Sequence, residues 1–282
     1  MEFNEKFNSY KLDIDLENLT EIAKKSASIG AEILKENYKK IQNIASKGRK
    51  GDLVTNVDLE VEKRIKEYLI KKTPKISILA EESGHLDNSN DLIWCIDPLD
   101  GTTNYSHGYP FFGTSIGLVY KDLPILGSIS VPYINELYWG CIGKGAFCNG
   151  KKLKVSNPKQ LSESLLVTGF AYDRFDIEDN NYAEFCRLTH KTRGVRRGGA
   201  AAVDLAFVAS GKVDGFWERG LEKWDIAAGS IIVYEAGATV SNYPKGNFEL
   251  STGRILSCSP SIELELKAEL SKVKPLNSQL YN

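Results

Sequence analysis

Residues 92–117, LIWCIDPLDGTTNYSHGYPFFGTSIG, contain the features that decide the fold and the chemistry of this chain. The apolar run Leu92–Ile96 predicts a short buried strand. The run ends in two carboxylates, Asp97 and Asp100, and a proline between them restricts the backbone. Gly101 permits a sharp turn after the pair, which leaves the next backbone N–H groups available to an anion. The stretch therefore combines cation ligands with anion-binding groups at the end of a strand.

Three interpretations of this acidic turn are open from the residues alone. Hard divalent cations prefer carboxylate and carbonyl oxygens, so Asp97 and Asp100 can share a cation in metal-assisted phosphoryl chemistry. The plainest alternative is an acidic turn without a ligand, because Asp, Pro, Gly and Thr are all favoured in turns. A third is a covalent aspartyl phosphatase of the haloacid dehalogenase type. Those enzymes have D-x-D-G-T, whereas this chain has D-x-x-D-G-T, one residue too long.

A second apolar run also ends in acids. Ile76–Ala80 is predicted to form a strand, and Glu81 and Glu82 follow it directly. In open α/β sheets, ligand sites gather beyond the carboxyl ends of strands. Two strands that both end in acids therefore predict a shared site. Ordinary surface acids are the alternative.

Two helix starts supply further candidate residues. Thr55 and Asp58 have the spacing of a capping box, with Asp in place of the usual Glu or Gln. A carboxylate at that place can also hold a water. Asp225 is predicted to be the N-cap of a second helix, and beside Trp224 it can instead ligate a cation. For Asp58 and for Asp225, capping alone is the simpler role.

The N-terminal part of the chain predicts an arm, a long helix and a loop. Residues 1–14 form the arm, and Asp15 caps a helix that runs to about Ala45. The segment Ser46–Gly51 is basic and contains glycines, which predicts an exposed loop. This loop is either a solvated linker or a lid that brings Lys47 near an anion.

The C-terminal half contains another glycine-bearing turn and another strand end. Gly198 and Gly199 precede a predicted helix of Ala200–Ala209, where they permit either close approach of a ligand oxygen or tight helix packing. The strand predicted at Val213–Trp217 ends in Glu218. The sequence leaves open whether the arginines before the glycines pair with acids or are solvated.

Composition restricts the class of protein. The 282 residues are 42% apolar and 26% charged, which is ordinary for a globular protein of one large or two small domains. A net charge of −1 excludes a general electrostatic attraction to nucleic acid or to an anionic membrane. The five cysteines include no C-x-x-C pair, which favours buried thiols in a reducing compartment. With no signal-like or membrane-spanning apolar run, the expected location is cytoplasmic.

Four segments together resemble the inositol monophosphatase family. IDPLDGTTNYSHGYPFFGTSIG is similar to the first signature of that family, and WDIAAGSIIVYEAG is similar to the second. GDLVTNVDLEVEK and ILAEES resemble the two segments that precede the first signature. They occur in the family's order, and the resemblance runs from about Leu16 to Glu269. It implies an α/β fold of alternating helix and sheet layers, like that of inositol monophosphatase and fructose-1,6-bisphosphatase.

The resemblance also assigns roles to individual residues. The implied metal ligands are four carboxylates and one backbone carbonyl: Glu81, Asp97, Leu99, Asp100 and Asp225. Asp58 and Thr102 match the pair that orients the attacking water, and Glu81 completes the catalytic set. The implied substrate-binding residues are Lys47, Gly101, Thr102, Gly199, Ala201 and Glu218.

The implied protein is a magnesium-dependent, lithium-sensitive phosphomonoesterase. Residues 15–282 would form a single phosphatase unit, in which 15–155 carry the first signature and 156–282 the second. A small phosphorylated polyol is the expected substrate and a homodimer the expected assembly, with no membrane or nucleic-acid partner.

Inositol 1-phosphate is the first choice of substrate, because the carboxylate of Glu218 can accept hydrogen bonds from hydroxyl groups. Fructose 1,6-bisphosphate, histidinol phosphate and 3′-phosphoadenosine 5′-phosphate are alternatives for the same site. A non-catalytic regulator that binds protein or RNA is a further alternative. The retained acids argue against it.

Overall fold

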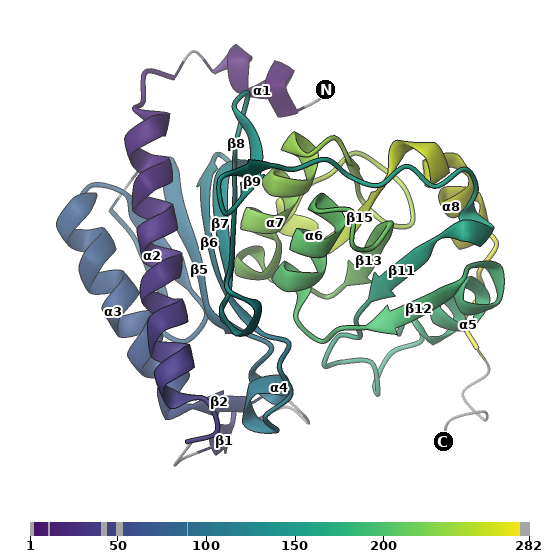
Figure 1. The fold of residues 1–282 in the computed structure, drawn as a ribbon, viewed down its shortest axis with the longest axis horizontal. Helices are drawn as coiled ribbons and strands as arrows, with labels where there is room; N and C mark the ends of the chain where they lie inside the picture. The colour runs from purple at the N-terminus through teal and green to yellow at the C-terminus, as the bar shows by residue number, and fades with distance from the viewer. Residues whose placement is uncertain (1–2, 11, 41–43, 49–52, 89, 277–282) are drawn as a thin grey trace.

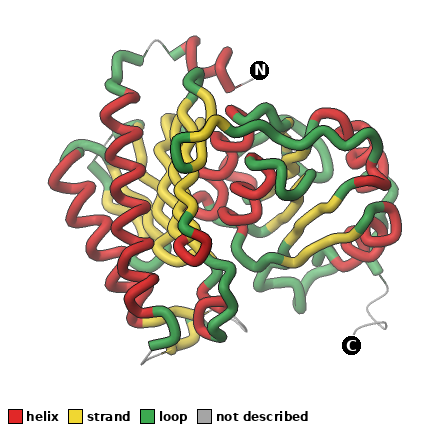
Figure 2. Tube along the Cα trace, viewed as in Figure 1, coloured by secondary structure: helices red, strands yellow, loops and turns green. Residues whose placement is uncertain are grey.

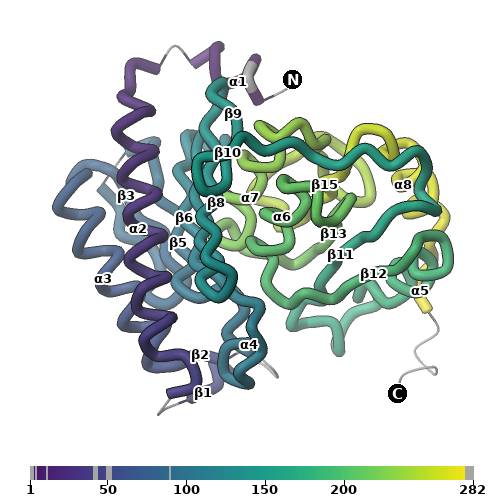
Figure 3. Tube along the Cα trace, viewed as in Figure 1, coloured from purple at the N-terminus to yellow at the C-terminus, as the bar shows by residue number. Residues whose placement is uncertain are grey.

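Helices and sheets alternate in layers through the structure. A computed structural model describes residues 3–10, 12–40, 44–48, 53–88 and 90–276 (Figures 1 and 2). The layers are a helix pair, an eight-stranded sheet, a second helix pair, a five-stranded sheet and a last helix pair. The predicted layered α/β class is confirmed. Figure 3 shows that the chain builds the first layers from its N-terminal half and the last layers from its C-terminal half.

The first layer consists of α2 (Leu16–Asn37) and α3 (Asn56–Lys72). The predicted cap of α2 is confirmed, because the carboxylate of Asp15 accepts the backbone N–H of Asn18 at 3.0 Å. The predicted continuation to Ala45 is wrong. Lys39 has a left-handed φ of 62°, which an α-helix does not accommodate. Beyond it, β1 (Ile44–Ser46) pairs with β2 (Leu53–Thr55) as an antiparallel hairpin.

The larger sheet contains the first acidic strand ends. Its order is β10-β9-β8-β7-β6-β5-β3-β4, and within it only the β3–β5 pair is parallel among the described strands. Because β3 and β5 are parallel neighbours, their carboxyl ends meet at one edge. The strands are β3 (Ser77–Ala80), β4 (Gly84–Leu86), β5 (Leu92–Asp100), β6 (Gly113–Tyr120), β7 (Leu123–Val131), β8 (Glu136–Cys141), β9 (Gly145–Cys148) and β10 (Lys151–Lys152).

The smaller sheet contains the strand that bears Glu218. Its order is β12-β11-β13-β15-β14, with β11 parallel to both β12 and β13. Two outer helices, α5 (Tyr182–Lys191) and α8 (Glu263–Leu270), contribute to the core on its far side. The strands are β11 (Leu165–Thr168), β12 (Gly194–Arg197), β13 (Gly215–Arg219), β14 (Thr239–Ser241) and β15 (Arg254–Cys258). The predicted end of β13 is corrected, because Glu218 lies within the strand.

The middle helices, α6 (Ala201–Ala209) and α7 (Lys223–Glu235), lie between the two sheets. A row of glycines brings α7 close to the larger sheet. Gly117, Gly127 and Gly140 are cross-strand neighbours on β6, β7 and β8. A Cβ on these three would lie 2.7, 2.5 and 3.0 Å from atoms of α7, so side chains there would push the helix away. The absence of these side chains lets the start of α7 approach the acids of β5.

The expected N-terminal arm contains a short helix, α1 (Phe3–Ser9). Its buried Phe3 ring stacks on Tyr234 of α7 and on Phe248, with ring centroids 4.6 and 5.7 Å apart. Such aromatic contacts stabilise the packing of α1 on the middle layer.

Two expectations from composition can be compared with the structure. The thiols of Cys95, Cys141 and Cys258 are free and buried, as predicted, whereas that of Cys186 is free and exposed. Among the helices of the described ranges, none has both the length and the apolar character that crossing a membrane requires.

Candidate active site

A cavity of about 620 Å³ lies where β3 and β5 end and where α6 and α7 begin. The structure brings together almost all of the residues predicted for the site. Those that line the cavity are Lys47, Glu81, Asp97, Leu99, Asp100, Gly101, Thr102, Gly199, Ala201, Glu218 and Asp225. The remaining candidate, Asp58, does not line the cavity, but it accepts a hydrogen bond from Thr102, which does.

Each of the three cavity aspartates is held by a backbone amide. Asp97 accepts the N–H of Leu99 at 3.0 Å, across the irregularity that ends β5. Asp100 accepts the N–H of Val203 at 3.1 Å. Because α6 has no side-chain cap of its own, this carboxylate stabilises the helix start from another layer. Such contacts fix each carboxylate without neutralising its charge.

Asp225 is the third residue of α7 rather than its N-cap. The helix begins at Lys223 with Glu222 as the N-cap, so the predicted capping position is wrong by three residues. The carboxylate of Asp225 accepts the backbone N–H of Glu222 at 2.7 Å. It therefore satisfies an amide of the first turn from inside the helix.

The two carboxylate oxygens of Asp58 have different partners. Its Oδ2 accepts the backbone N–H of Thr55 at 2.9 Å, which confirms the capping box. Its Oδ1 accepts the hydroxyl of Thr102 at 3.0 Å, and Leu99 O is also 3.0 Å from that hydroxyl. Burial raises the pKa of Asp58, while hydrogen bonds from Thr55 and Thr102 oppose the rise.

Burial and the charges of neighbouring acids disfavour the ionisation of the cavity aspartates. Burial is the largest cause, and it raises the pKa of Asp100 to about 7. Burial and the neighbouring Glu81 raise the pKa values of Asp97 and Asp225 well above the ordinary range. A cation among these groups would reverse the effect, because it favours the charged forms.

Lys47 places a cationic side chain next to this group of acids. Its Nζ donates to Glu81 Oε1 and to Glu82 Oε1, both at 2.6 Å. Burial raises the pKa of Glu82 to about 7, and the hydrogen bond from Lys47 opposes that rise. The anions that Lys47 contacts are therefore these two carboxylates.

The donor set has the chemistry that a hard divalent cation requires. All candidate ligands are oxygen atoms, namely carboxylates and the carbonyl of Leu99. In the described conformation, no three acidic, histidine or cysteine side chains of the described ranges surround one point closely enough to hold an ion. Glu81 is bonded to Lys47, and Asp225 is bonded to the amide of Glu222. The residues fit a divalent cation by donor type, provided that these two carboxylates turn toward it.

The opposite side of the cavity is formed by α6 and β13. Glu218 is buried, and burial raises its pKa to about 8, while the nearby Arg197 opposes the rise. Gly169 lies against this carboxylate, since a Cβ there would be 2.2 Å from both Glu218 oxygens. Gly199 has a left-handed φ of 81° and lies beneath the guanidinium of Arg197.

Two charged residues on this side were not assigned to the site from the sequence. Arg197 lines the cavity. Asp204 of α6 is buried, and its Oδ2 has no hydrogen-bond partner in the part of the chain that is described. Burial and the nearby Glu218 raise the pKa of Asp204. A charged residue inside the otherwise apolar run AAAVDLAFVA was the available signal for Asp204.

Comparison with known proteins identifies the family of this chain. The sequence model of the inositol monophosphatase family matches residues 15–274. The chain belongs to this family. Its family membership makes it a phosphoric monoester hydrolase and implies dependence on a divalent metal.

Individual relatives cover nearly the whole chain. An inositol-1-monophosphatase of Synechocystis is 49% identical over 91% of this chain and 90% of that protein. A fructose-1,6-bisphosphatase/inositol-1-monophosphatase of Aquifex aeolicus is 41% identical over 85% and 92%. The Nus factor SuhB of Escherichia coli is 36% identical over 90% and 94%. The solved inositol monophosphatase of Anabaena superposes with a TM-score of 0.86 at 46% identity, over 94% of this chain and all of that one.

Proposed function

We propose that this member of the inositol monophosphatase family hydrolyses polyol phosphates, with inositol 1-phosphate as the preferred substrate and myo-inositol and phosphate as products. The observation that carries the proposal is the pairing, in one cavity, of a group of acids with a separate buried carboxylate, Glu218. The acids suit a cation that binds phosphate, and Glu218 suits an alcohol rich in hydroxyls. The similarity to the Synechocystis enzyme favours inositol phosphate within this class.

Magnesium is the proposed metal. Its ligands would be Glu81, Asp97, Asp100 and Asp225 with the carbonyl of Leu99, all oxygen donors on the cavity wall. When bound, a divalent cation polarises the phosphate ester and lowers the pKa of water. The protein contributes the fixed positions of these oxygens, which the amide contacts of the aspartates support.

Thr102 and Asp58 would orient the attacking water. The hydroxyl of Thr102 donates to Asp58, so its lone pairs are free to accept a hydrogen bond from water. The raised pKa of Asp58 suits it to take up a proton through Thr102 as the water attacks. Attack by water makes a covalent aspartyl intermediate unnecessary. The D-x-x-D spacing is consistent with that.

The substrate would lie between the acids and β13. Backbone N–H groups at Gly101 and Thr102 would bind the phosphate, and Gly199, Ala201 and Glu218 would bind the alcohol. Gly101 has a left-handed φ of 91°, and a Cβ there would lie 3.0 Å from Phe111 O. Lys47 would approach the phosphate when Glu81 turns to the cation.

The remaining expectations extend the same proposal. Residues 15–282 would act as a single phosphatase unit in a cytoplasmic homodimer, and lithium would inhibit it. Fructose 1,6-bisphosphate is the second candidate substrate, because the Aquifex relative is named for both activities. Glu218 disfavours it, since a carboxyl group cannot neutralise a second phosphate as a lysine or arginine does.

The test is magnesium-dependent phosphate release from four substrates: inositol 1-phosphate, fructose 1,6-bisphosphate, histidinol phosphate and 3′-phosphoadenosine 5′-phosphate. Wild type and Asp225→Asn are compared. We expect preference for inositol 1-phosphate and its loss in the variant. Preference for another substrate would overturn the polyol role of Glu218. If magnesium-loaded wild type released no phosphate from any of the four substrates, the proposed function would be contradicted and a regulatory protein would be favoured.

A further inference from the structure

The segment 169–181 connects β11 to α5, and its first part forms one wall of the cavity. Gly169 to Arg174 line the cavity beside Glu218. The close approach of Gly169 to the Glu218 carboxylate, described above, places the beginning of this wall at the alcohol side of the site. The wall is therefore positioned to contact the leaving alcohol rather than the phosphate.

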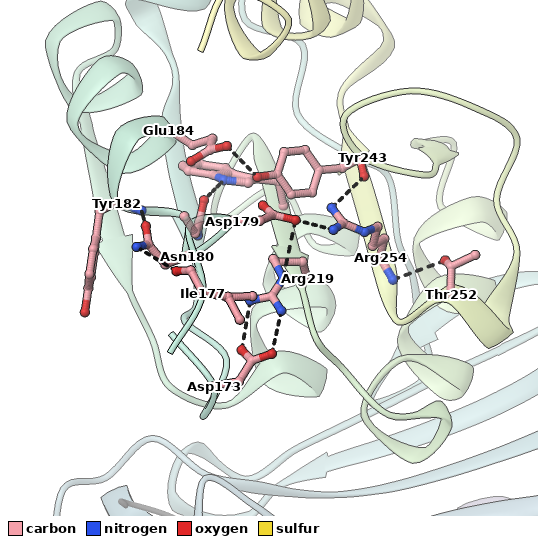
Figure 4. A network of polar contacts seen from close by, with 12 residues as sticks. Asp173, Ile177, Asp179, Asn180, Tyr182, Glu184, Arg219, Tyr243, Thr252 and Arg254 are labelled. Atoms are coloured by element: carbon pink, nitrogen blue, oxygen red, sulfur yellow. Dashed lines mark hydrogen bonds and ion pairs between the residues drawn. The ribbon is translucent and has the colours of Figure 1, made fainter. Parts of the chain in front are cut away.

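Two arginines of the smaller sheet hold this wall (Figure 4). The guanidinium of Arg219 on β13 donates two hydrogen bonds to the carboxylate of Asp173, at 2.9 and 2.7 Å. Its Nε lies 3.7 Å from Asp179 Oδ2, which also accepts a hydrogen bond from Arg254 on β15. The Arg219 side chain is only 9% exposed, and its two parallel hydrogen bonds fix the position of the Asp173 carboxylate.

The end of β13 explains how one strand contacts both substrate and wall. Side chains alternate along a strand, so Glu218 and Arg219 point to opposite faces. Glu218 faces the cavity at Gly169, while Arg219 reaches the wall at Asp173. The next residue, Gly220, has a φ of 72°, and a Cβ there would lie 2.6 Å from the Cβ of Ala171. The wall thus folds closely around the end of the strand that bears Glu218.

We propose that Arg219 is a positioning residue that sets selectivity for the leaving alcohol by holding, through Asp173, the wall formed by residues 169–174. This inference rests on the proposed phosphatase function. Tyr172 and Arg174 line the cavity from this wall and offer polar groups to a substrate rich in hydroxyls. The three cavity aspartates do not depend on the wall, because the amides that hold them belong to β5, to α6 and to the start of α7.

The experiment compares two substrates in four proteins. Inositol 1-phosphate fills the alcohol side, whereas glycerol 2-phosphate has a smaller alcohol that reaches less of the wall. The variants are Arg219→Met, Asp173→Asn and the double variant. The control is Arg187→Met, which removes an ion pair to Glu269 between the outer helices α5 and α8. The Asp173 and Asp179 side chains are 42% and 45% exposed, so solvent can compensate their charge when Arg219 is removed.

Each single variant is expected to lower the ratio of kcat/KM for inositol 1-phosphate to that for glycerol 2-phosphate by about tenfold, the size of one lost polar contact to a charged group. The double variant should lower the ratio no further, because both changes break one contact. The control should leave the ratio unchanged. Equal losses on both substrates, or additive losses in the double variant, would overturn the inference. A wild type inactive on both esters would instead refute the proposed function.

Discussion

The aspartates of the active-site cavity and those of the neighbouring arginine network differ in whether they have a cationic partner. In the network, Asp173 pairs with Arg219 and Asp179 pairs with Arg254 (Figure 4). In the cavity, Asp97, Asp100 and Asp225 are buried or half-buried, and within the described ranges none of them forms an ion pair with a lysine or arginine. The cavity lies at the ends of β3 and β5 and the starts of α6 and α7, and the network lies at β13 and β15. Each network aspartate has an arginine partner, whereas among the described residues the three cavity aspartates have no lysine or arginine partner.

This difference indicates which acids are available to bind a cation. Buried acids without a counterion lower the free energy of unfolding at neutral pH, because their ionisation is opposed. A protein keeps such acids where a bound cation supplies the missing charge. The paired acids of the network stabilise the wall instead.

The largest expected effect comes from removing a cavity acid. Asp97→Asn should lower magnesium-dependent kcat/KM for inositol 1-phosphate on the order of 10³-fold, because it removes a ligand charge that stabilises the transition state. Initial rates of phosphate release at saturating magnesium measure this. The matched variant in the network, Asp173→Asn, should keep its activity on glycerol 2-phosphate. Near-normal turnover by Asp97→Asn would contradict the assignment of Asp97 as a metal ligand.

A smaller loss of activity is expected at the alcohol side. Gly169→Ala places a Cβ within 2.2 Å of the Glu218 oxygens, so the carboxylate must move. We expect KM for inositol 1-phosphate to rise roughly tenfold while kcat changes little, since the contact is lost before and during the reaction alike. Steady-state kinetics separate the two constants. A fall in kcat at unchanged KM would instead connect Glu218 with the acids of β5.

The stability of the metal-free protein should depend on pH through the cavity acids. The folded pKa of Asp100 is about 7, above its ordinary value of 3.8, so the native state binds more protons between these values. The contribution of Asp100 to stability is therefore largest below about pH 4, its ordinary pKa, and it decreases as pH rises toward 7. In chelator at about pH 7.5, Asp100→Asn should raise Tm by roughly 3–6 °C. Scanning calorimetry measures this. A lower Tm of the variant would show that the charge of Asp100 is compensated without metal.

Magnesium should reverse the difference in Tm between wild type and Asp100→Asn. The ion is expected to raise the Tm of wild type more at about pH 7.5 than at about pH 5, because the acids must lose protons to bind it. It should barely change the Tm of Asp100→Asn. An equal rise for both proteins would place the bound ion away from the cavity.

The smallest effect is expected for an ion pair on the outer layer. Arg187→Met removes the contact to Glu269, in which the arginine side chain is 32% exposed. Solvent screens such pairs, so Tm should change by no more than about 1 °C and activity should not change. A larger change would mean that the outer helices support the cavity.

Local patterns in the sequence predicted the parts of the site that are built locally. Two apolar runs ending in acids gave β3 and β5 and the meeting of Glu81 with Asp97. The Thr55–Asp58 spacing gave the capping box. These succeeded because the end of a strand and the cap of a helix are determined by residues adjacent in sequence.

The features that escaped prediction depend on contacts distant in sequence. Asp100 accepts the first-turn amide of Val203 in α6, 103 residues away, and no pattern of neighbouring residues predicts that contact. The contact between Asp173 and Arg219 spans 46 residues in the same way. The short strands β12 and β14 lie at the edges of their sheet, where one partner suffices and the apolar pattern is weak.

Calorimetric titration of magnesium into Asp225→Asn and Asp173→Asn, beside wild type, tests the central claim most directly. If the cavity aspartates lack a lysine or arginine partner because they bind a divalent cation, the first variant should lose magnesium binding, and the second should bind like wild type. Equal binding by all three proteins would contradict the assignment of these acids as the metal site.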